Sequence, residues 1–366
     1  MAAPAKIALV HDWLTSFGGA ERCLILMHQL FPTAPIYTLV CDRRRLPPEL
    51  ADARIVTSTL QSLPGSTGNW QRFLPAMPLA IEQFDLREYD LILSSSHAVA
   101  KGVLTHPRQK HLCYCYTPMR YIWDLYHTYI ERTELSALAE RVFRLTAHYL
   151  RQWDYASAQR VDKFLAISET VQQRIRHHYG REAPVVYPPV DTQFFTPDPS
   201  AAADYYLVVS RFVPYKRVDL AVEVFNYRED KLLVIGGGPQ EKRLKGMARR
   251  NVEFLGAVTD DELRTLYQNC KALVFTAEED FGLTPVECMA CGRPVIALGY
   301  GGAAETVADG ETGVHFAEQT PQALDSAVDR LERAELSPAA CRRRAVRFDQ
   351  SVFLAKLRAA ADYLLG

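Results

Sequence analysis

The sequence predicts an α/β protein built from two doubly wound domains that face a cleft. Its 366 residues exceed the size at which a single hydrophobic core usually stops growing, which favours two domains. Two stretches alternate short Val/Ile/Leu runs with turns and amphipathic helices, as parallel sheets with covering helices do. A proline-rich run at 187–199 separates them, because neither a helix nor a central strand continues through such a run.

The apolar runs place the strands of each Rossmann-like domain. The N-terminal domain, predicted at 1–195, has strands at 6–10, 36–40, 54–58, 91–95, 111–116 and 164–167, with a further one at 185–187. The C-terminal domain, predicted at 196–348, has strands at 206–209, 232–235, 252–255, 272–275 and 295–297. The amphipathic segment 349–366 is predicted to be a helix that packs on one of the two domains.

The composition excludes several classes of protein. A formal net charge of −1 gives no support to nucleic-acid binding. The N-terminus turns polar too early for a signal peptide, and no apolar run reaches the ~18 residues of a spanning helix, so we expect a cytoplasmic location. Cys288 and Cys291 have redox or zinc spacing, but no second pair completes a site, so we predict structural thiols and no bound metal.

Segment 60–84 leaves two interpretations open. It is rich in turn residues and in apolar side chains and carries few charges. A groove or a contact with a membrane surface is one interpretation, and it would place the protein at the inner face of the plasma membrane. A pair of helices that packs on its own domain is the other.

The first candidate site follows the first strand. Ligands of open parallel sheets lie at the carboxyl ends of the strands, so polar and glycine residues directly after a strand are candidates. Here the chain runs through His11 and Asp12 to Gly18 and Gly19, and then into an apolar helix. Glycines at such a turn let backbone N–H groups approach a phosphate, although a tight turn alone also requires glycine.

Two cations follow the first strand of the second domain. Arg211 and Lys216 flank a proline turn, so both can reach one diphosphate; the alternative is an exposed basic loop. The next strand ends in glycines around Gly237. A dinucleotide-binding domain also has a glycine turn, but its Gly-x-Gly-x-x-Gly spacing at a first strand is absent.

The sharpest pattern runs from Glu279 to Glu287. An acidic cluster leaves a strand, Gly282 turns the chain, and Glu287 lies in a short helix. We expect both glutamates to face one crevice at the strand ends, where carboxylates accept hydrogen bonds from sugar and ribose hydroxyls. The backbone N–H groups near Phe281 and Leu283 can bind a diphosphate at the helix start.

At these residues the chain resembles the retaining family-4 glycosyltransferases, which have the GT-B fold, and the likeness covers nearly the whole chain. Glu279 and Glu287 match that family's Glu-x7-Glu motif. Arg211 and Lys216 match its cations on the donor diphosphate, and Gly18-Gly19 matches its N-terminal glycine loop. Segments 167–170, 255–258 and 301–307 also resemble the family.

The resemblance implies a role for each residue. The two cations stabilise charge on the leaving diphosphate, as a metal ion does in other transferases, so neither a metal nor another cofactor is expected. Glu287 holds the ribose, Glu279 contacts the donor sugar and the base rests near Val258. Gly237 and the backbone at Phe281, Gly282 and Leu283 complete the donor site. Retention implies that the acceptor attacks from the face that the diphosphate leaves, so that a phosphate oxygen can take its proton.

One position departs from the family pattern. Many relatives carry a His-Thr pair after the strand at 111–116, where this chain has Tyr116-Thr117. His97, at the end of the preceding strand, is then the candidate catalytic histidine, although such a histidine can also be structural. Tyr116, Arg120 and Trp123 suit an acceptor or its phosphate, and a buried aromatic loop with an ion pair is the alternative.

The leading hypothesis is transfer of a hexose from a GDP- or UDP-linked sugar to a glycan or polyprenyl-diphosphate-linked acceptor in surface polysaccharide synthesis. The likeness is closest to bacterial enzymes that use GDP-mannose, so mannose is the first donor sugar to test. Three alternatives remain: a sugar-nucleotide epimerase of the same fold, a dinucleotide-dependent oxidoreductase, and a catalytically silent subunit of a polysaccharide assembly complex. The sequence identifies neither the acceptor nor the oligomeric state.

Overall fold

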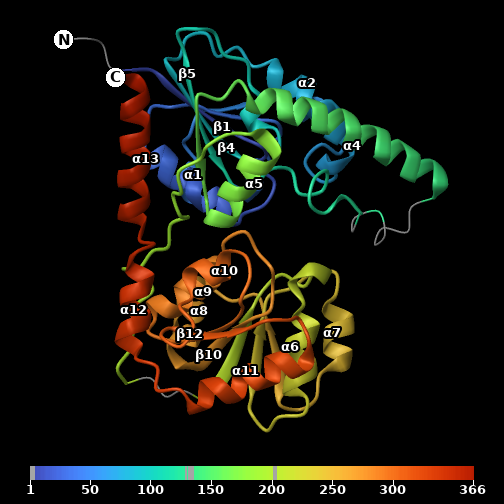
Figure 1. Ribbon diagram of the computed structural model, residues 1–366. Coiled ribbons are helices and arrows are strands. Elements are labelled where there is room, and N and C mark those ends of the chain that lie inside the picture. The colour runs from blue at the N-terminus through green and yellow to red at the C-terminus, as the bar shows by residue number, and fades with distance from the viewer. Residues whose placement is uncertain (1–4, 128–129, 131–135, 201–203) are drawn as a thin grey trace. The chain divides into compact units, whose positions relative to one another are not determined.

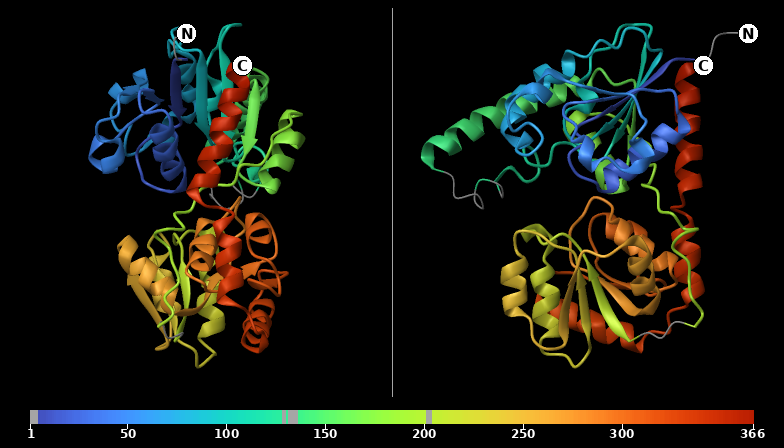
Figure 2. Two further views of the ribbon diagram at one scale, coloured as in Figure 1. Left: turned by 90° about the vertical axis from the view of Figure 1, so that its left-hand side faces the viewer. Right: turned by 180° about the vertical axis from the view of Figure 1, so that it is seen from behind.

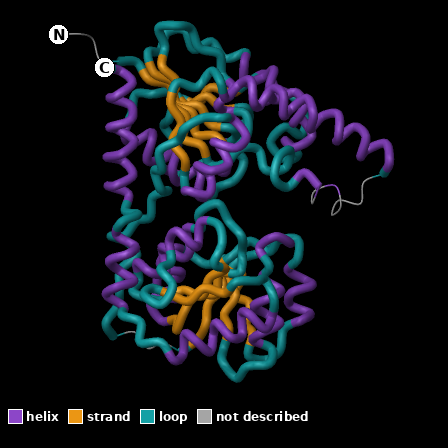
Figure 3. Tube along the Cα trace, viewed as in Figure 1, coloured by secondary structure: helices purple, strands orange, loops and turns teal. Residues whose placement is uncertain are grey.

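The computed structural model describes residues 5–127, 130, 136–200 and 204–366. Its contacts divide the chain into two units. Unit 1 consists of Met1–Tyr187 and Phe353–Gly366, and unit 2 is Pro188–Val352. Each unit has its strands at the centre and helices and loops around them (Figure 1, Figure 3).

Unit 1 contains a six-stranded sheet in the order β3-β2-β1-β4-β5-β6, and every paired strand is parallel. Its strands are β1 (Ile7–His11), β2 (Ile36–Thr38), β3 (Ile55–Thr57), β4 (Leu91–Ser96), β5 (Lys110–Cys115) and β6 (Lys163–Ala166). The central strands are buried along nearly their whole length. A parallel sheet is covered on both faces, which explains why these strands are continuous apolar runs rather than alternating ones.

The helices of unit 1 begin and end at recognisable signals. They are α1 (Gly19–Leu30), α2 (Met77–Glu82), α4 (Ala137–Ala158), α5 (Glu169–Tyr179) and α13 (Gln350–Leu365), with 3-10 turns η1 (Arg43–Arg45), η2 (Pro48–Leu50), η3 (Thr59–Ser62), η4 (Trp70–Ala76) and η5 (Ala100–Gly102). The Ser168 hydroxyl caps α5 by accepting from the Val171 N–H, and Gly180 ends that helix at a φ of 66°. Such a left-handed position favours glycine.

Unit 2 repeats the same sheet topology. Its order is β12-β11-β10-β7-β8-β9, again parallel throughout. The strands are β7 (Tyr205–Val209), β8 (Leu232–Ile235), β9 (Val252–Gly256), β10 (Cys270–Phe275), β11 (Val295–Leu298) and β12 (Gly313–Phe316). Numbered from its own first strand, unit 2 has the order 6-5-4-1-2-3, which is the order of unit 1 read from the other edge. This is the strand order of Rossmann-type sheets.

The helices of unit 2 pack around that sheet. They are η6 (Pro214–Lys216), α6 (Val218–Phe225), α7 (Glu241–Met247), α8 (Asp260–Asn269), α9 (Leu283–Ala290), α10 (Gly302–Thr306), α11 (Pro321–Arg333) and α12 (Pro338–Val346). A capping box of Thr259 and Glu262 begins α8, since each side chain bonds the backbone N–H of the other residue. No helix in the described part of the chain is long and apolar enough to cross a membrane.

The division between the units lies earlier than the predicted boundary at 195/196. The chain joins unit 2 directly after Tyr187, because the Val190 N–H donates to the Phe348 carbonyl at 2.9 Å and the Val190 carbonyl accepts from Gln350. The predicted strand at 185–187 is a single bridge between Ala166 and Val185. The prolines that follow Tyr187 prevent a longer ladder.

The C-terminal helix α13 packs on unit 1. Phe353 and Leu357 are buried, and the Phe353 ring lies 5.4 Å from that of Tyr114 on β5, measured between centroids. The Arg358 guanidinium donates to the Leu30 carbonyl at the end of α1, at 3.0 Å. Strand β12 is absent from the sequence prediction, because its His315 interrupts an already short apolar run.

Segment 60–84 combines features of both interpretations. Met77 and Ile81 of α2 are buried in the unit 1 core, as a segment packing on its own domain requires. The preceding turn, η4, has no buried residue, although the Trp70 ring stacks on Trp13 with centroids 3.8 Å apart. The core of unit 1 thus buries one face of α2, leaving Leu79 exposed, and covers η4 only in part.

Candidate active site

Three of the predicted site residues follow strands at which a sheet reverses its order. In unit 1 the order reverses between β1 and β4, and in unit 2 between β7 and β10. His97 follows β4, Lys216 follows β7 and Glu279 follows β10. The carboxyl ends of strands at such a switch point are where open α/β sheets bind ligands.

In unit 2, Lys216 and Glu279 meet across the switch point. The Lys216 ammonium forms an ion pair with the Glu279 carboxylate, although the residues lie on different loops. The Thr276 hydroxyl donates to the Lys216 carbonyl at 2.8 Å and so ties the two loops together. Both side chains remain partly accessible, at 13% and 24% exposure. A diphosphate that arrives here would compete with the carboxylate for the ammonium.

Arg211 is exposed on the loop after β7. The Val213 N–H donates to its carbonyl at 2.9 Å, which turns the chain toward η6. The exposed guanidinium is accessible to an anion, as the predicted phosphate contact requires. Arg217 adopts a left-handed φ of 52° and leads from η6 into α6.

The glycine turn around Gly237 packs on that same loop. Gly236 and Gly238 have φ values of 124° and 153°, and a Cβ on Gly236 would overlap the Ser210 carbonyl oxygen. The Gly237 carbonyl accepts from the Phe212 N–H at 2.8 Å. The glycines therefore let the loops after β7 and β8 lie in direct contact. This packing is a reason for glycine here in addition to the predicted phosphate contact.

Glu287 has a more enclosed environment than Glu279. It lies within α9, is buried and accepts a hydrogen bond from the Tyr267 hydroxyl at 3.0 Å. Burial raises the pKa of Tyr267 well above its ordinary value, and the neighbouring Glu287 charge adds to the shift. Tyr267 thus orients the Glu287 carboxylate. Sequence reasoning missed it, because a tyrosine inside an amphipathic helix carries no distinguishing signal.

The turn that begins α9 is locked by a second pair of glycines. Gly282, with a φ of 86°, precedes Leu283, the first residue of α9. The Gly302 N–H donates to the Glu279 carbonyl at 2.8 Å, and a Cβ on Gly302 would overlap the backbone of Phe281. The backbone of the predicted diphosphate loop is therefore held by α10.

Val258 lies after β9, at one border of a depression of about 590 Å3. Leu255 and Ala257 line it from the strand side, and Asp261 and Glu262 from α8. The depression thus has an apolar and a polar wall, and it includes the predicted position of the base at Val258.

In unit 1, Asp12 organises the loop after β4. Its carboxylate accepts four backbone N–H groups, those of residues 97–100, at 2.7 to 3.0 Å. Nδ1 of His97 lies 3.0 Å from Oδ2 of the same carboxylate. Burial raises the pKa of Asp12, but the charge and hydrogen bonds of His97 outweigh it and hold that pKa well below its usual range. Asp12 was part of a sequence motif but not a predicted site residue.

The ring of His97 remains accessible. Its side chain is 29% exposed and stands edge-on to Trp13, with centroids 4.5 Å apart. Burial lowers the pKa of His97, but the charge and hydrogen bond of Asp12, together with the Glu21 charge, outweigh burial and raise that pKa above its ordinary value. The Asp12 carboxylate thus fixes the His97 ring at the strand end.

Tyr116 is engaged within unit 1. Its hydroxyl bonds the Ser95 hydroxyl at 2.9 Å and donates to the Ala20 carbonyl at 3.1 Å. Ser95 in turn lies 3.0 Å from Nδ1 of His11. The hydroxyl of Tyr116 therefore holds β4, β5 and α1 together, while its ring lies 6.3 Å from that of His97, measured between centroids.

The glycine loop at Gly18 and Gly19 leads into α1. Gly18 is the N-cap residue, with φ −160° and no capping side chain, and Gly19 begins the helix. Glu21 is buried in the first turn, with its carboxylate 3.8 Å from Nε2 of His11. A phosphate at this helix start would lie close to the Glu21 charge.

The two remaining predicted residues differ in environment. The Trp123 indole donates to the buried Asp154 at 2.8 Å and stacks on His178, which corresponds to the alternative of an aromatic loop. Arg120 is half-buried. Asp154 also accepts from the Tyr179 hydroxyl at 2.8 Å and pairs with the buried Lys101. Sequence reasoning missed this buried pair.

Two further features are structural. All eight cysteines are free and buried, and Sγ of Cys270 lies 3.9 Å from that of Cys288. No cluster of metal-ligating side chains occurs among the described residues.

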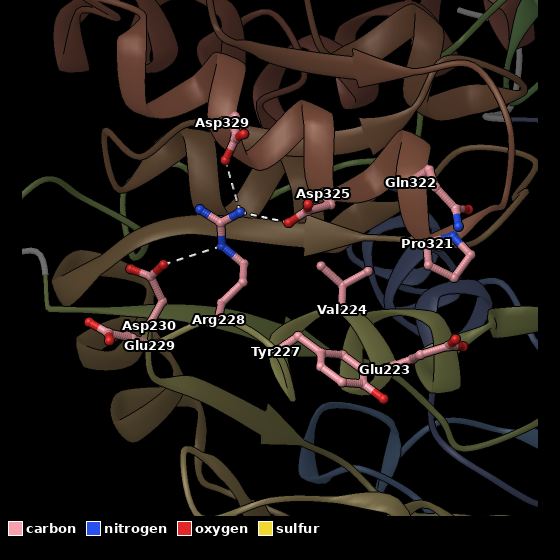
Figure 4. Close-up of a pocket in the computed structure, with 10 residues that line it drawn as sticks. All are labelled: Glu223, Val224, Tyr227, Arg228, Glu229, Asp230, Pro321, Gln322, Asp325 and Asp329. Atoms are coloured by element: carbon pink, nitrogen blue, oxygen red, sulfur yellow. Dashed lines mark hydrogen bonds and ion pairs between the residues drawn. The ribbon is translucent and has the colours of Figure 1, made fainter.

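Figure 4 shows a pocket around Arg228, whose guanidinium pairs with Asp230, Asp325 and Asp329. Asp230 precedes β8, at the amino end of the sheet, so these ion pairs fasten α11 rather than form a ligand site.

Two family models match adjacent parts of the chain. Residues 17–194 match the model described as Glycosyltransferase Family 4, and residues 191–348 match the one described as Glycosyl transferases group 1. Together they account for most of both units.

Three curated relatives are between 23% and 30% identical to this chain over the residues aligned. An alpha-1,3/1,6-mannosyltransferase of Dictyostelium discoideum is 23% identical over 63% of this chain and 64% of its own length. A GDP-mannose-dependent alpha-(1-6)-phosphatidylinositol monomannoside mannosyltransferase of Mycolicibacterium smegmatis is 30% identical over 45% of this chain and 51% of its own length. An uncharacterized glycosyltransferase of Methanocaldococcus jannaschii is 29% identical over 44% and 47%. The chain thus spans about half to two thirds of the length of these relatives.

Solved structures resemble the whole chain. HepE of Anabaena, in complex with UDP, has a TM-score of 0.73 at 19% identity and covers 98% of this chain and 100% of its own. Sucrose-phosphate synthase from Thermosynechococcus elongatus has a TM-score of 0.72 at 18% identity, covering 98% and 99%. At such identities the likeness shows the fold alone.

Proposed function

Since the chain belongs to the family-4 glycosyltransferases and has their GT-B fold, we propose that it transfers a hexose from a nucleotide diphosphate sugar to a glycan or polyprenyl-diphosphate-linked acceptor. The observation that carries this proposal is the meeting of Lys216 and Glu279 at the switch point of unit 2, where exposed Arg211 follows the same strand as Lys216. A cation pair and a carboxylate at one strand edge supply what a diphosphate and a sugar hydroxyl need.

Arg211 and Lys216 stabilise the charge that grows on the leaving diphosphate, so we assign no metal ion to this step. Glu279 is released from Lys216 when phosphate arrives and then accepts hydrogen bonds from the sugar. Glu287, oriented by Tyr267, accepts from the ribose hydroxyls. The depression beside Val258 takes the base.

We assign a retaining course to the reaction. The bond between the anomeric carbon and the phosphate oxygen breaks, and the acceptor oxygen bonds that carbon from the same face. The acceptor proton goes to the leaving diphosphate, which departs as the nucleoside diphosphate. His97, held in place by Asp12, donates a hydrogen bond to the transferred sugar, the task for which its accessible ring and raised pKa suit it.

Mannose is our first choice of donor sugar, because two of the relatives above are mannosyltransferases and one uses GDP-mannose. HepE of Anabaena binds UDP, so uridine donors are the second choice. Polysaccharide synthesis at the inner face of the plasma membrane is the proposed setting.

A thermal-shift screen with GDP-mannose, UDP-glucose, UDP-GlcNAc and NAD tests class and donor together, because a ligand that binds only the folded state raises apparent stability. We expect a shift with one sugar nucleotide and none with NAD. Glu287→Ala and Lys216→Met should abolish both the shift and turnover. Lys231→Met is the matched control, since Lys231 lies at the amino end of β8 and pairs with Glu253 at the surface.

A shift with NAD alone would overturn the assignment. Conversion of the donor sugar in the absence of an acceptor would point to the epimerase alternative. Unchanged turnover in the Glu287→Ala variant would show that the donor does not bind at the proposed site in unit 2.

A further inference from the structure

Helix α4 carries an exposed apolar stripe. Leu138, Val142, Leu145 and Tyr149 are 74%, 55%, 73% and 46% exposed. Their spacing of four, three and four residues places them on one side of a helix that turns 100° per residue. Single exposed leucines are ordinary on protein surfaces, but a continuous exposed stripe marks an interaction surface.

An apolar groove continues this stripe. It has a volume of about 730 Å3 and lies between α4 and η4. Leu138 and Val142 belong to both the stripe and the groove, and Trp70, Leu74 and Pro75 form the opposite wall. The part of segment 60–84 that the core leaves half-covered is therefore the part that faces α4.

The rest of α4 fixes the stripe in place. Its buried residues, from Ala147 to Ala158, all lie in the second half of the helix, where Asp154 bonds Lys101, Trp123 and Tyr179. The first half extends beyond the sheet of unit 1, as the separate views agree (Figure 1, Figure 2). The helix is thus anchored at one end and presents the stripe at the other.

The charges around the stripe are mostly positive. Arg141 and Arg144 are exposed along one flank of it, and Arg72 borders the groove. The one carboxylate among the charged residues of η4 and of the exposed half of α4 is Glu140, which pairs with Arg144 at 2.7 Å. This surface is therefore cationic, although the whole chain has a net charge of −1.

We propose that the α4 surface, defined as the stripe, the groove and Arg72, Arg141 and Arg144, binds the headgroup region of an anionic lipid bilayer. An apolar face flanked by arginines is what lies in a membrane interface, where apolar side chains enter the acyl boundary and cations meet anionic headgroups. A second copy of the chain fits less well, because a two-fold axis would bring like cations together. The binding requires neither a nucleotide sugar nor an acceptor, so it is independent of the proposed reaction.

Flotation of the purified chain with vesicles tests this proposal. One set is phosphatidylcholine with a third phosphatidylglycerol, and the other is phosphatidylcholine alone. We expect binding to the anionic vesicles that weakens with added salt, and much weaker binding to the neutral ones. Arg141→Gln should weaken binding about fivefold, the effect of removing one charge at such a surface. Leu138→Glu with Leu145→Glu should weaken it by at least about tenfold.

Leu104→Glu is the matched control, since Leu104 is 48% exposed in unit 1 but lies outside the α4 surface. It should bind like the unaltered chain. A thermal melt of each variant shows that it is folded, as expected for substitutions at exposed positions. The proposal is wrong if the double variant binds vesicles unchanged, or if neutral and anionic vesicles bind equally. It is also wrong if binding requires polyprenyl phosphate in the vesicle, or if the stripe variants instead abolish a dimer seen by light scattering.

Discussion

Replacing Asp12 by asparagine tests how the N-terminal half of the site is built. The substitution keeps the size of the side chain and removes its charge. An amide presents one oxygen and one NH2 group to the loop, so the two N–H groups that now meet one carboxylate oxygen would face a donor instead. The His97 ring would also lose its countercharge.

The size of the effect follows from these contacts. Asp12 is fully buried, accepts four charge-assisted hydrogen bonds and lies against the His97 ring, whose pKa it raises. Hydrogen bonds to a charged group contribute about 1.5 to 3 kcal/mol each, and breaking a buried ion pair costs about 3 to 5 kcal/mol. Because an asparagine oxygen still accepts two of the four N–H groups, two of these bonds are lost, and we expect the unfolding free energy of unit 1 to fall by at least about 3 kcal/mol.

Tryptophan fluorescence in a urea titration measures this loss in the right part of the molecule. All four tryptophans, at positions 13, 70, 123 and 153, belong to unit 1, so unit 2 contributes no tryptophan signal. Asp85→Asn is the control, because Asp85 forms an exposed pair with Arg87 and such pairs contribute little. Turnover of the variant, measured at low temperature where it stays folded, should also fall because His97 loses its fixed position.

A variant with the unfolding midpoint of the original chain would refute this reasoning. So would a destabilised variant that retains full turnover, because the Asp12 contacts would then serve folding alone.

Three further predictions concern other contacts. Burial lowers the pKa of His97 and the Asp12 contacts raise it, with a net rise. The stabilising contribution of His97 is therefore complete below about pH 6.5 and is lost as the pH rises through the folded-state pKa. Unit 1 of the unaltered chain should lose more unfolding free energy between pH 6.5 and 9 than unit 1 of the His97→Gln variant, and equal losses would contradict the pairing. Lys101→Met leaves the Asp154 charge buried and should lower the unfolding free energy of unit 1 by about 3 to 5 kcal/mol in the same titration, whereas Lys6→Met, at a side chain 65% exposed, should change little. Gly236→Ala should abolish the thermal shift with the donor, because the new Cβ would overlap the Ser210 carbonyl oxygen. The control Gly246→Ala lies inside α7 with no atom within 4 Å of the new Cβ, so it should bind the donor normally and gain about 0.5 to 1 kcal/mol of unfolding free energy. A donor shift retained in Gly236→Ala would show that the loops after β7 and β8 can separate.

Much of the fold follows from the sequence because buried parallel strands are continuous apolar runs. Eleven of the structure's strands, β1 to β11, overlap predicted ones, among them β8, whose bounds at Leu232 and Ile235 are the predicted ones. Strand β12 was missed because Gly313 and His315 break its apolar run. Helix α4 was not predicted, because its exposed leucines and buried Asp154 reverse the usual arrangement of apolar and charged residues.

The candidate site divides in the same way. Residues that follow strands, such as Lys216 and Glu279, could be placed at one edge from topology alone. Their direct pairing could not, and neither could the hydrogen bond from Tyr267 to Glu287, because both depend on how loops far apart in sequence fold against each other. The four N–H groups on Asp12 are backbone contacts, which leave no mark on residue identity.

The order in which the chain is made has a consequence for unit 1. Unit 1 is discontinuous, since its last element, α13, follows the whole of unit 2 in the sequence. During synthesis, unit 2 is therefore complete before unit 1 can bury Tyr114 of β5 under Phe353. A nascent chain would hold a finished C-terminal unit and an N-terminal sheet that still lacks one covering helix. Mutations in α13 should consequently reduce the yield of folded protein through the N-terminal half, although α13 follows unit 2 in the sequence.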